Sequence, residues 1–378
     1  MTLFLLDLAL ERSKDSPLTV TLNLSTVRAN RLAVRIISAV VAHCRRWKTA
    51  ELQISNALIP HFAPIRNHLP LLSDLIVQNF GDFPMPFPYA QVAPRLAHVT
   101  LNGFPHENSP LPWDSIGRTF SETVFPMEVR AMEIYLKILK NNPQLESLDV
   151  TYPDAGKRSK SNLTHFSLRR LFTDDGNLIR ALTLPKLEEL VVGPENDTMP
   201  AIRDMLTRSK CSPRSLRLID FTLDKDLRTI LSSSANLRTL VLRFIGWGAE
   251  DEKTMELLVK MLAEPSFLPR LEDLEILIDQ ERDEEPLDGP FRIMFINDAF
   301  VQMLAARWER RRPAERQGDL RRVCVLAELP STVGLSKSRG VGGLQKMSDE
   351  GLDVIVLARD PRASDLSQAA KNISYVYM

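Results

Sequence analysis

The sequence predicts an α/β fold, an irregular leucine-rich-repeat solenoid with a curved parallel sheet on its concave side and helices outside. Three observations predict it: a recurring leucine pattern, prolines that precede those leucines, and a spacing near 24 residues. We expect the solenoid to occupy residues 1–358, in units of about 24–25 residues, and residues 359–378 to form a C-terminal tail.

The leucine pattern marks the predicted strands, because alternate side chains of a half-buried strand are apolar. The motif Leu-x-x-(Leu/Val/Phe)-x-(Leu/Val/Ile) begins at eight positions, which are Leu72, Leu96, Leu145, Leu163, Leu187, Leu237, Leu271 and Leu320. A leucine-rich chain of this length yields on the order of half a dozen such matches by chance. The leucines alone therefore do not establish a repeat.

The positions of the prolines show that the leucine pattern is not due to chance alone. Proline makes up 25 of the 378 residues, yet it stands two residues before five of the eight leucines, at Pro70, Pro94, Pro143, Pro185 and Pro269. Proline fixes φ and donates no hydrogen bond, so it ends a helix and suits the start of a strand.

The spacing adds a period. Successive leucines are 24, 49, 18, 24, 50, 34 and 49 residues apart, so two gaps equal 24 and three lie near twice that value. The segment Pro213–Phe221 lies midway across the 50-residue gap and is predicted to be a degenerate copy. A unit of this length is typical of leucine-rich repeats.

Within a predicted strand the side chains alternate, so that Leu190 and Val192 point to one side and Glu189 and Val191 to the other. Between the strands, apolar spacing predicts helices over residues 26–43, 127–141, 250–263 and 297–312. The first of these would be capped by Ser25 or Thr26. An ordinary α/β globule with leucine-rich strands is the alternative architecture.

Composition limits the partners. Net charge is zero and the pI is near 7, which argues against a dedicated nucleic-acid surface. No apolar run reaches the roughly 18 residues that a membrane span needs. The first residues also lack the basic segment and cleavage site of a signal peptide. We therefore expect a monomer in the cytoplasm or nucleus that binds neither nucleic acid nor membrane.

No motif for catalysis is found, so we expect no enzyme activity, no cofactor, and no catalytic or metal site. The chain has no G-x-G-x-x-G, no phosphate-binding loop and no G-x-S-x-G, and its three cysteines, Cys44, Cys211 and Cys324, are far apart. The acidic run 279–285 and the basic run 307–312 are interpreted as solvated segments rather than as a cation site and a nucleic-acid site. An unrecognised hydrolase or transferase is the least favoured alternative.

Several segments resemble the leucine-rich-repeat part of fungal F-box proteins, over roughly residues 5–358. They are Leu8–Ser13 with Ser16–Leu18, His43–Trp47, Leu69–Leu72, Ala93–Leu96, Leu111–Trp113, Arg307–Trp308 and Gly351–Val354. The resemblance implies a substrate-recognition arm of a ubiquitin ligase. That family's F-box precedes its first strand, whereas seven residues precede Leu8 here. A ligase adaptor is therefore an expected partner only if an F-box lies upstream.

The leading hypothesis is a protein-interaction module that binds a client protein through its concave strand face; a non-catalytic scaffold or a degenerate family member without a ligase role is the alternative. Sixteen outward strand positions approach the roughly 20–30 residues a side of a standard interface. They lean acidic, which favours a client with a basic or mixed surface. They are Asp74, Ile76, His98, Thr100, Ser147, Asp149, His165, Ser167, Glu189, Val191, Thr239, Val241, Asp273, Glu275, Arg322 and Cys324.

Overall fold

The computed structural model of the chain has an α/β fold in which strands pair in parallel beside helices. It divides into two compact units, Met1–Lys186 and Leu187–Met378. The structure describes residues 2–25, 30–79, 87–103, 111–112, 116–123, 131–151, 162–193, 198–245, 247–279, 293–308, 320–328, 340–359 and 374–377.

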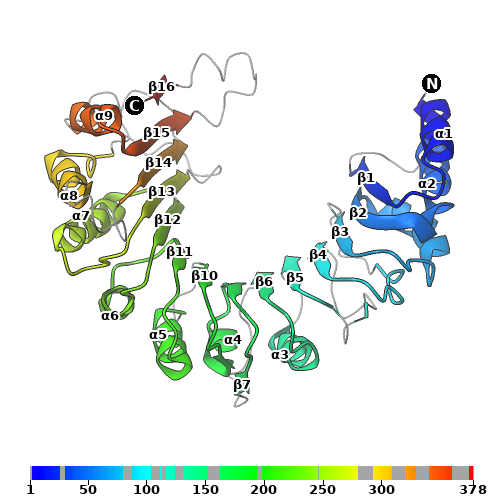
Figure 1. Cartoon of the computed structure of the whole chain (residues 1–378), viewed down its shortest axis with the longest axis horizontal. Coiled ribbons are helices and arrows are strands. Elements are labelled where there is room, and N and C mark those ends of the chain that lie inside the picture. Colours follow the sequence, from blue (N-terminus) through cyan, green and yellow to red (C-terminus); the bar gives the residue numbers. More distant parts are fainter. Residues whose placement is uncertain are drawn as a thin grey trace. The chain divides into compact units, whose positions relative to one another are not determined.

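In the first unit, seven described strands pair in parallel and in chain order (Figure 1). They are β1 (Leu18–Leu24), β2 (Trp47–Ile54), β3 (Asp74–Asn79), β4 (His98–Asn102), β5 (Thr119–Thr123), β6 (Ser147–Thr151) and β8 (Arg170–Thr173). Two short strands, β7 (Leu163–Thr164) and β9 (Leu182–Thr183), form a separate parallel ladder.

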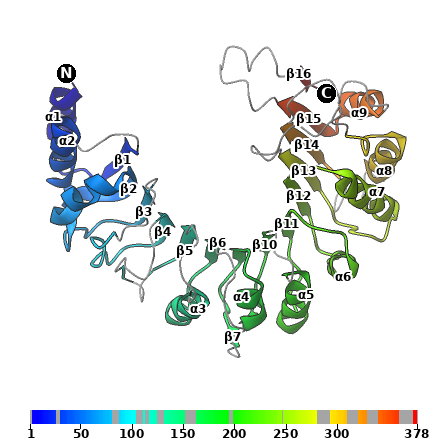
Figure 2. The same ribbon diagram turned by 180° about the vertical axis from the view of Figure 1, so that it is seen from behind.

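The helices of this unit all lie on one side of its sheet, as both views of the ribbon show (Figures 1 and 2). They are α1 (Thr2–Arg12), α2 (Arg31–Val41), the 3-10 helices η1 (Cys44–Arg46) and η2 (Asn56–Ile65), α3 (Ala131–Asn141) and α4 (Gly176–Ala181). No described helix covers the other face of the sheet, which we call the open face. Burial alternates along the strands accordingly, so β3 and β4 bury every second residue.

In the second unit, six parallel strands again follow chain order: β10 (Glu189–Val192), β11 (Ser215–Ile219), β12 (Thr239–Ile245), β13 (Asp273–Asp279), β14 (Arg322–Glu328) and β15 (Asp353–Arg359). A further strand, β16 (Ser374–Tyr377), pairs antiparallel with β15, so part of the segment expected to be a tail belongs to the sheet. Helices α5 (Thr198–Ser209), α6 (Lys225–Ser233), α7 (Ala249–Ala263), α8 (Asp298–Trp308) and α9 (Val341–Asp349) lie on one side of this sheet and leave its open face uncovered (Figure 1).

The leucine pattern is confirmed for seven of its eight positions, because a strand begins two residues after each leading leucine. Each of these seven leucines is at most 3% exposed, namely Leu72, Leu96, Leu145, Leu187, Leu237, Leu271 and Leu320. The predicted degenerate copy forms β11. Burial of the leading leucine thus fixes where each strand starts.

The prediction at Leu163 is wrong. The strand of the main sheet begins at Arg170, two residues after Leu168, which is fully buried. The true repeat is therefore Leu168-x-x-Leu171-x-Thr173, and the pattern missed it because Thr173 stands where the motif requires an aliphatic side chain. Phe166, taken as a strand core residue by the pattern, is 65% exposed.

The predicted helices are found, with one corrected start. Helix α2 begins at Arg31 rather than at residue 26, because Asn30 Oδ1 accepts a hydrogen bond from Ala33 N at 2.9 Å and caps it. Of the two expected caps, Ser25 does not cap this helix, and Thr26 lies outside the described residues. Helix α7 matches its predicted range to within one residue. Residues 127–130 of the second predicted helix and residues 309–312 of the last one lie outside the described residues.

An aromatic chain crosses the core of the second unit. The rings of Phe221, Phe244, Trp247, Phe295 and Phe300 contact in that order, with centroids 4.8–5.6 Å apart. Aromatic pairs at this separation add to the free energy gained from burial. This row of aromatic rings joins the end of β12 to the starts of α7 and α8, so it holds successive strand–helix repeats together.

Two further tryptophans are buried. Trp47 is fully buried and donates from Nε1 to the carbonyl of Val40 at 3.3 Å, and Trp308 is 8% exposed. Trp113 lies outside the described residues. Of the helices that the structure describes, none combines the length and apolar character needed to cross a membrane.

Candidate functional site

The open face of the first unit carries side chains in rows, because its parallel strands are in register. The row nearest the strand starts consists of Thr49, Asp74, His98, Thr119, Ser147 and Arg170. The next row consists of Glu51, Ile76, Thr100, Ser121, Asp149 and Phe172. Six predicted positions thus lie side by side in two neighbouring rows, and each is partly exposed.

A third row on this face was missed by the sequence analysis. It consists of Asn23, Gln53, Gln78 and Asn102, followed by Thr123 and Thr151. Four successive side-chain amides therefore face the same way at neighbouring strands, about 4.8 Å apart. The signal that could have found them is the polar residue six positions after a leading leucine, at Gln78, Asn102 and Thr151.

The second unit repeats this arrangement with a different composition. One row consists of Glu189, Ser215, Thr239, Asp273, Arg322 and Asp353, and the next of Val191, Arg217, Val241, Glu275, Cys324 and Ile355. The predicted positions Val191, Val241 and Cys324 lie in the second row but are only 3–4% exposed. Their neighbours in the row, Arg217 and Glu275, remain accessible.

His165 and Ser167 are not part of the open-face rows, which corrects their prediction. Both precede β8, whose own residues on this face are Arg170 and Phe172. His165 is 3% exposed; its Nε2 lies 3.0 Å from the Asn142 carbonyl, and its Nδ1 accepts from Leu168 N at 3.1 Å. The imidazole therefore fixes the turn before β8. Burial lowers its pKa, which keeps the ring neutral.

Charged groups on the open faces are mostly paired with their neighbours. His98 Nδ1 lies 2.8 Å from Thr119 Oγ1, and its Nε2 is 4.0 Å from Asp74. In the second unit Arg322 lies 3.6 Å from Asp353, and Arg243 pairs with Asp279. These contacts hold side chains in place across strands without removing them from solvent.

Asp149 differs from the other carboxylates on this face. Burial raises its pKa to about 6, opposed by the charge of Arg170 and a hydrogen bond with Ser121. Ser121 and Phe172 are its neighbours in the row. A partly desolvated carboxylate of this kind gains more than an exposed one when a cationic group of a partner approaches it.

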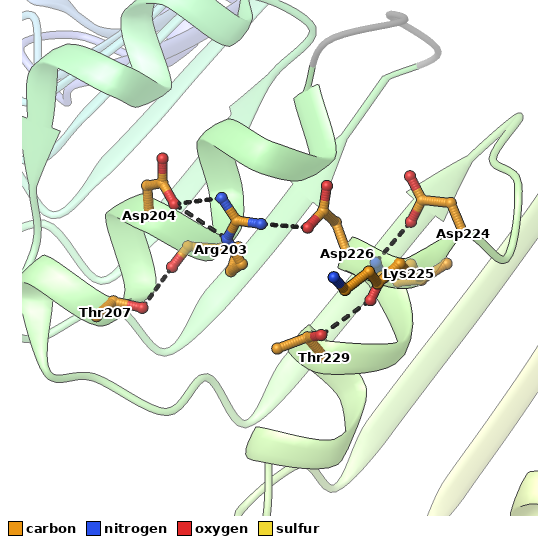
Figure 3. Close-up of polar contacts among 8 residues, drawn as sticks. Arg203, Asp204, Thr207, Asp224, Lys225, Asp226 and Thr229 are labelled. Atoms are coloured by element: carbon orange, nitrogen blue, oxygen red, sulfur yellow. Dashed lines mark hydrogen bonds and ion pairs between the residues drawn. The ribbon is translucent and has the colours of Figure 1, made fainter.

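The surface of α5 and α6 gathers a second group of polar side chains (Figure 3). The Arg203 guanidinium bridges Asp204, at 2.8 Å, and Asp226 of the neighbouring helix. Asp224 accepts from Leu227 N at 2.7 Å and caps α6. Asp224 also lines an open depression of about 750 Å³, together with Leu223, Lys225, Arg228, Thr229, Ser232 and Ser233.

These contacts have a structural role. The hydroxyls of Thr207 and Thr229 donate to the carbonyls of Arg203 and Lys225, each one helical turn earlier, at 2.8 and 2.9 Å. The hydroxyls in Figure 3 thus bond backbone carbonyls rather than a general base. The arrangement caps one helix and ties it to the next.

The thiols and carboxylates that were considered as ligands do not assemble in the described part of the chain. No group of three or more His, Cys, Asp or Glu side chains there could hold a metal ion. Burial raises the pKa of the Cys44, Cys211 and Cys324 thiols, which disfavours their reactive thiolate form. Most of the acidic run, residues 280–285, lies outside the described residues.

The basic run begins with a side chain that is not solvated. Arg307 is 7% exposed, and it donates from Nε to the Leu262 carbonyl at 2.6 Å and from Nη1 to the Leu268 carbonyl at 3.1 Å. It therefore satisfies carbonyls at the end of α7 and in the turn that follows. The interpretation of this residue as part of a solvated helix end is wrong, because its side chain is buried and bonded to backbone carbonyls.

No known protein-family model matches the chain, and no curated protein is significantly similar to it in sequence.

Proposed function

We propose that the chain is a protein-interaction module that binds a client protein on the open faces of its sheets. The observation that carries this proposal is the alignment of partly exposed polar side chains in register rows, opposite the helix-covered face. Such a surface offers many hydrogen-bonding groups at fixed spacing, which suits recognition by complementarity.

The amide row gives the first unit a way to bind a peptide backbone. A carboxamide has both a donor group and an acceptor oxygen, so it pairs with the N–H and C=O of an extended peptide. Gln78 and Asn102 lie next to each other in this row. Two of its amides also have contacts within the chain: Gln53 Nε2 lies 3.4 Å from Glu51, and Asn23 Oδ1 accepts a hydrogen bond from the Ser25 hydroxyl at 3.0 Å.

Charge indicates the kind of client. Among the side chains that the structure describes in the second unit, five carboxylates lie on the open face, at Glu189, Asp273, Glu275, Asp279 and Asp353, against three guanidiniums, at Arg217, Arg243 and Arg322. A client with a basic or mixed surface fits this excess. We expect its affinity to fall as ionic strength rises, because exposed charges are screened within about 8 Å in 0.15 M salt.

We further infer that the repeated strand–helix units form an irregular leucine-rich-repeat solenoid with the open faces on its concave side. The resemblance to the repeats of fungal F-box proteins supports a role as the substrate-recognition part of a ubiquitin ligase, in the cytoplasm or nucleus. A ligase adaptor would be a partner only where an F-box precedes the repeats. Recovery of a client without any adaptor supports a scaffold instead.

The test is affinity purification with mass spectrometry on the native full-length protein and two charge-reversed forms. The first form carries Asp273→Lys and Glu275→Lys on the open face. The matched control carries Glu250→Lys and Glu256→Lys on α7, which makes the same change of charge on the helix face. We expect clients to be lost from the first form and kept by the second. Clients retained equally by both forms would contradict the proposal.

A further inference from the structure

A small basic cavity lies at the N-terminal edge of three neighbouring strands in the second unit. Its volume is about 330 Å³, and it is lined by Ser212, Arg214, Asn236, Arg238 and Arg270. Arg214 and Arg238 directly precede β11 and β12, whereas Ser212, Asn236 and Arg270 stand three residues before β11, β12 and β13. Equivalent positions before three successive strands, β11, β12 and β13, therefore line one cavity. It does not involve the open face.

The backbone keeps these positions adjacent. Arg238 N donates to the Arg214 carbonyl at 2.8 Å, and Glu272 N donates to the Arg238 carbonyl at 2.7 Å. These hydrogen bonds extend the ladders of the parallel strands, whose spacing is about 4.8 Å. The side chains at the cavity are thus carried by a rigid sheet edge rather than by a long loop.

Positive charge at the cavity exceeds what the described residues neutralise. Arg238 is bonded to Glu272 at 3.1 Å, but that carboxylate is shared with Arg321 at 3.5 Å. Within the described part of the chain, Arg270 donates to the neutral Asn236 Oδ1, at 2.8 Å, and forms no ion pair. Arg214 has no carboxylate partner among the residues that the structure describes. Guanidinium groups brought together in this way repel one another unless an anion lies between them.

Two neutral donors complete the set. The Ser212 hydroxyl oxygen is buried and has no hydrogen-bond partner within the described structure, which costs free energy unless a ligand satisfies it. Asn236 presents its oxygen to Arg270, because a guanidinium can only donate, so its NH₂ group is left to donate elsewhere. The cavity therefore offers donors from five side chains and lacks a carboxylate in its lining.

We propose that this cavity binds a phosphate group. A phosphate monoester presents several acceptor oxygens in a tetrahedral arrangement and carries close to two negative charges near neutral pH. Guanidinium forks match its oxygens in pairs, and the hydroxyl and amide take further oxygens. A carboxylate has only two oxygens and would leave donors unpaired. The volume lies at the lower end of the range for ligand sites, about 300–1,000 Å³.

Calorimetric titration of the full-length protein with inorganic phosphate at low ionic strength tests the site. We expect Arg214→Ala and Arg270→Ala each to weaken binding about tenfold or more, because each removes charge-assisted hydrogen bonds. The matched control is Arg228→Ala, an exposed arginine of α6 whose loss changes net charge equally, and it should bind as the native protein does. Equal weakening by all three variants, or no binding by the native protein, would overturn the proposal.

A neutral change guards against misfolding as an explanation. Ser212→Ala keeps the charge, removes the unpaired hydroxyl, and is expected to weaken phosphate binding by roughly two- to tenfold without lowering the thermal midpoint. Each variant is checked by circular dichroism before titration. Unchanged phosphate affinity in Ser212→Ala together with unchanged affinity in Arg214→Ala would refute the site.

The source of the phosphate is distinguished by a second set of titrations. A peptide with one phosphoserine, the same peptide unphosphorylated, and inorganic phosphate are compared on the native protein. Tighter binding of the phosphopeptide than of inorganic phosphate assigns the site to phosphorylated proteins, and the reverse order assigns it to a free phosphate compound. Both outcomes support a phosphate site. Because these probes and variants avoid the open face, their failure would leave the proposed client binding untouched.

Discussion

Arg307 and His165 illustrate how single buried polar side chains hold the turns between strands. Arg307 reaches from α8 to the carbonyls that end α7, and His165 joins the turn before β8 to the end of α3 through the Asn142 carbonyl. Buried carbonyls without partners cost free energy, so each side chain supports a segment that has no regular hydrogen bonds of its own. Neither role is visible in the sequence, where Arg307 begins a basic run and His165 falls within the leucine motif that starts at Leu163.

Replacing Arg307 should therefore destabilise the second unit strongly. We expect Arg307→Ala to lower the free energy of unfolding by roughly 2–4 kcal/mol, because several buried carbonyls lose their donor at once. Urea denaturation followed by circular dichroism measures this loss. Arg228→Ala, on the exposed surface of α6, should change stability by less than about 0.5 kcal/mol. Similar effects of the two substitutions would contradict the assigned role.

Asp149 should make stability depend on pH. Its pKa in the folded protein, about 6, is raised above the ordinary value of 3.8, so folding favours the protonated form. The shifted pKa of Asp149 does not change the free energy of unfolding at pH values below both pKa values. It lowers that free energy progressively as the pH rises from about 4 to about 6, and the loss persists at higher pH. We expect Asp149→Asn to stabilise the protein at pH 8 by on the order of 1 kcal/mol, after allowance for solvent screening, and to have little effect at pH 3.5.

Urea denaturation of both proteins at these two pH values measures the difference. If Asp149→Asn destabilises the protein equally at pH 3.5 and pH 8, the carboxylate acts through its hydrogen bond with Ser121 and its desolvation is unimportant.

At the scale of elements, strand β5 shows why some strands escape the leucine pattern. Its leading position is Gly117, and its last inward position is Glu122, which is fully buried. A buried carboxylate needs donors, and Tyr135 of α3 provides one at 2.8 Å from its hydroxyl to Glu122 Oε2. Strand and helix are therefore joined by a polar contact where the neighbouring units use aliphatic side chains.

The contact predicts a cost for removing one hydroxyl. Tyr135→Phe keeps the ring, which packs 6.5 Å from Phe120, but takes a donor from the buried Glu122 carboxylate. We expect a loss of about 1–3 kcal/mol in the free energy of unfolding. The double variant Tyr135→Phe with Glu122→Gln should recover part of it, because the uncharged amide is less costly to bury. No loss in the single variant would show that other donors suffice.

The strands that the pattern found and those that it missed differ at identifiable positions. Leucine at the leading position, with two aliphatic residues after it, was sufficient for seven strands, because all three side chains are buried. Strands β2, β5 and β15 carry Trp47, Gly117 and Gly351 at the leading position, and Gly351 has a φ of +102° that favours glycine. Such substitutions satisfy the fold through tertiary contacts or backbone geometry that a one-dimensional pattern does not contain.

The candidate site was predictable to a similar degree. Alternation placed fourteen of the sixteen positions on the open face, and the two exceptions, His165 and Ser167, followed from the displaced motif at Leu163. Alternation did not predict burial within the face: Val191, Val241 and Cys324 lie on the open face and are nevertheless only 3–4% exposed. The cavity near Arg214 depends on three turns, so no single segment indicates it.

At the scale of the whole molecule, the chain is organised as two compact units, each with its own run of parallel strands and its own helices. Leucines of the same motif occur on both sides of the division at Lys186, so the sequence pattern gives no sign of it. The described strands of each unit's main sheet pair with the strands next to them in chain order, so we expect stability to be local.

Hydrogen exchange should reveal this locality. Leu240 of β12 is fully buried, and Leu240→Ala is expected to destabilise its surroundings by about 2–5 kcal/mol. Mass spectrometry of amide exchange should then show faster exchange in β10–β15 and smaller changes in β1–β6. A uniform acceleration across both units would mean that the chain unfolds as one cooperative body.

The antiparallel strand β16 has a consequence for solubility. Without it, β15 would present a row of unsatisfied amide and carbonyl groups to which a strand of another molecule could add. Ser374–Tyr377 occupies those groups with the chain's own backbone and runs antiparallel to β15, whereas the other strands described in the second unit pair in parallel. These four residues therefore block the addition of a strand from another molecule at this edge, a role separate from ligand recognition.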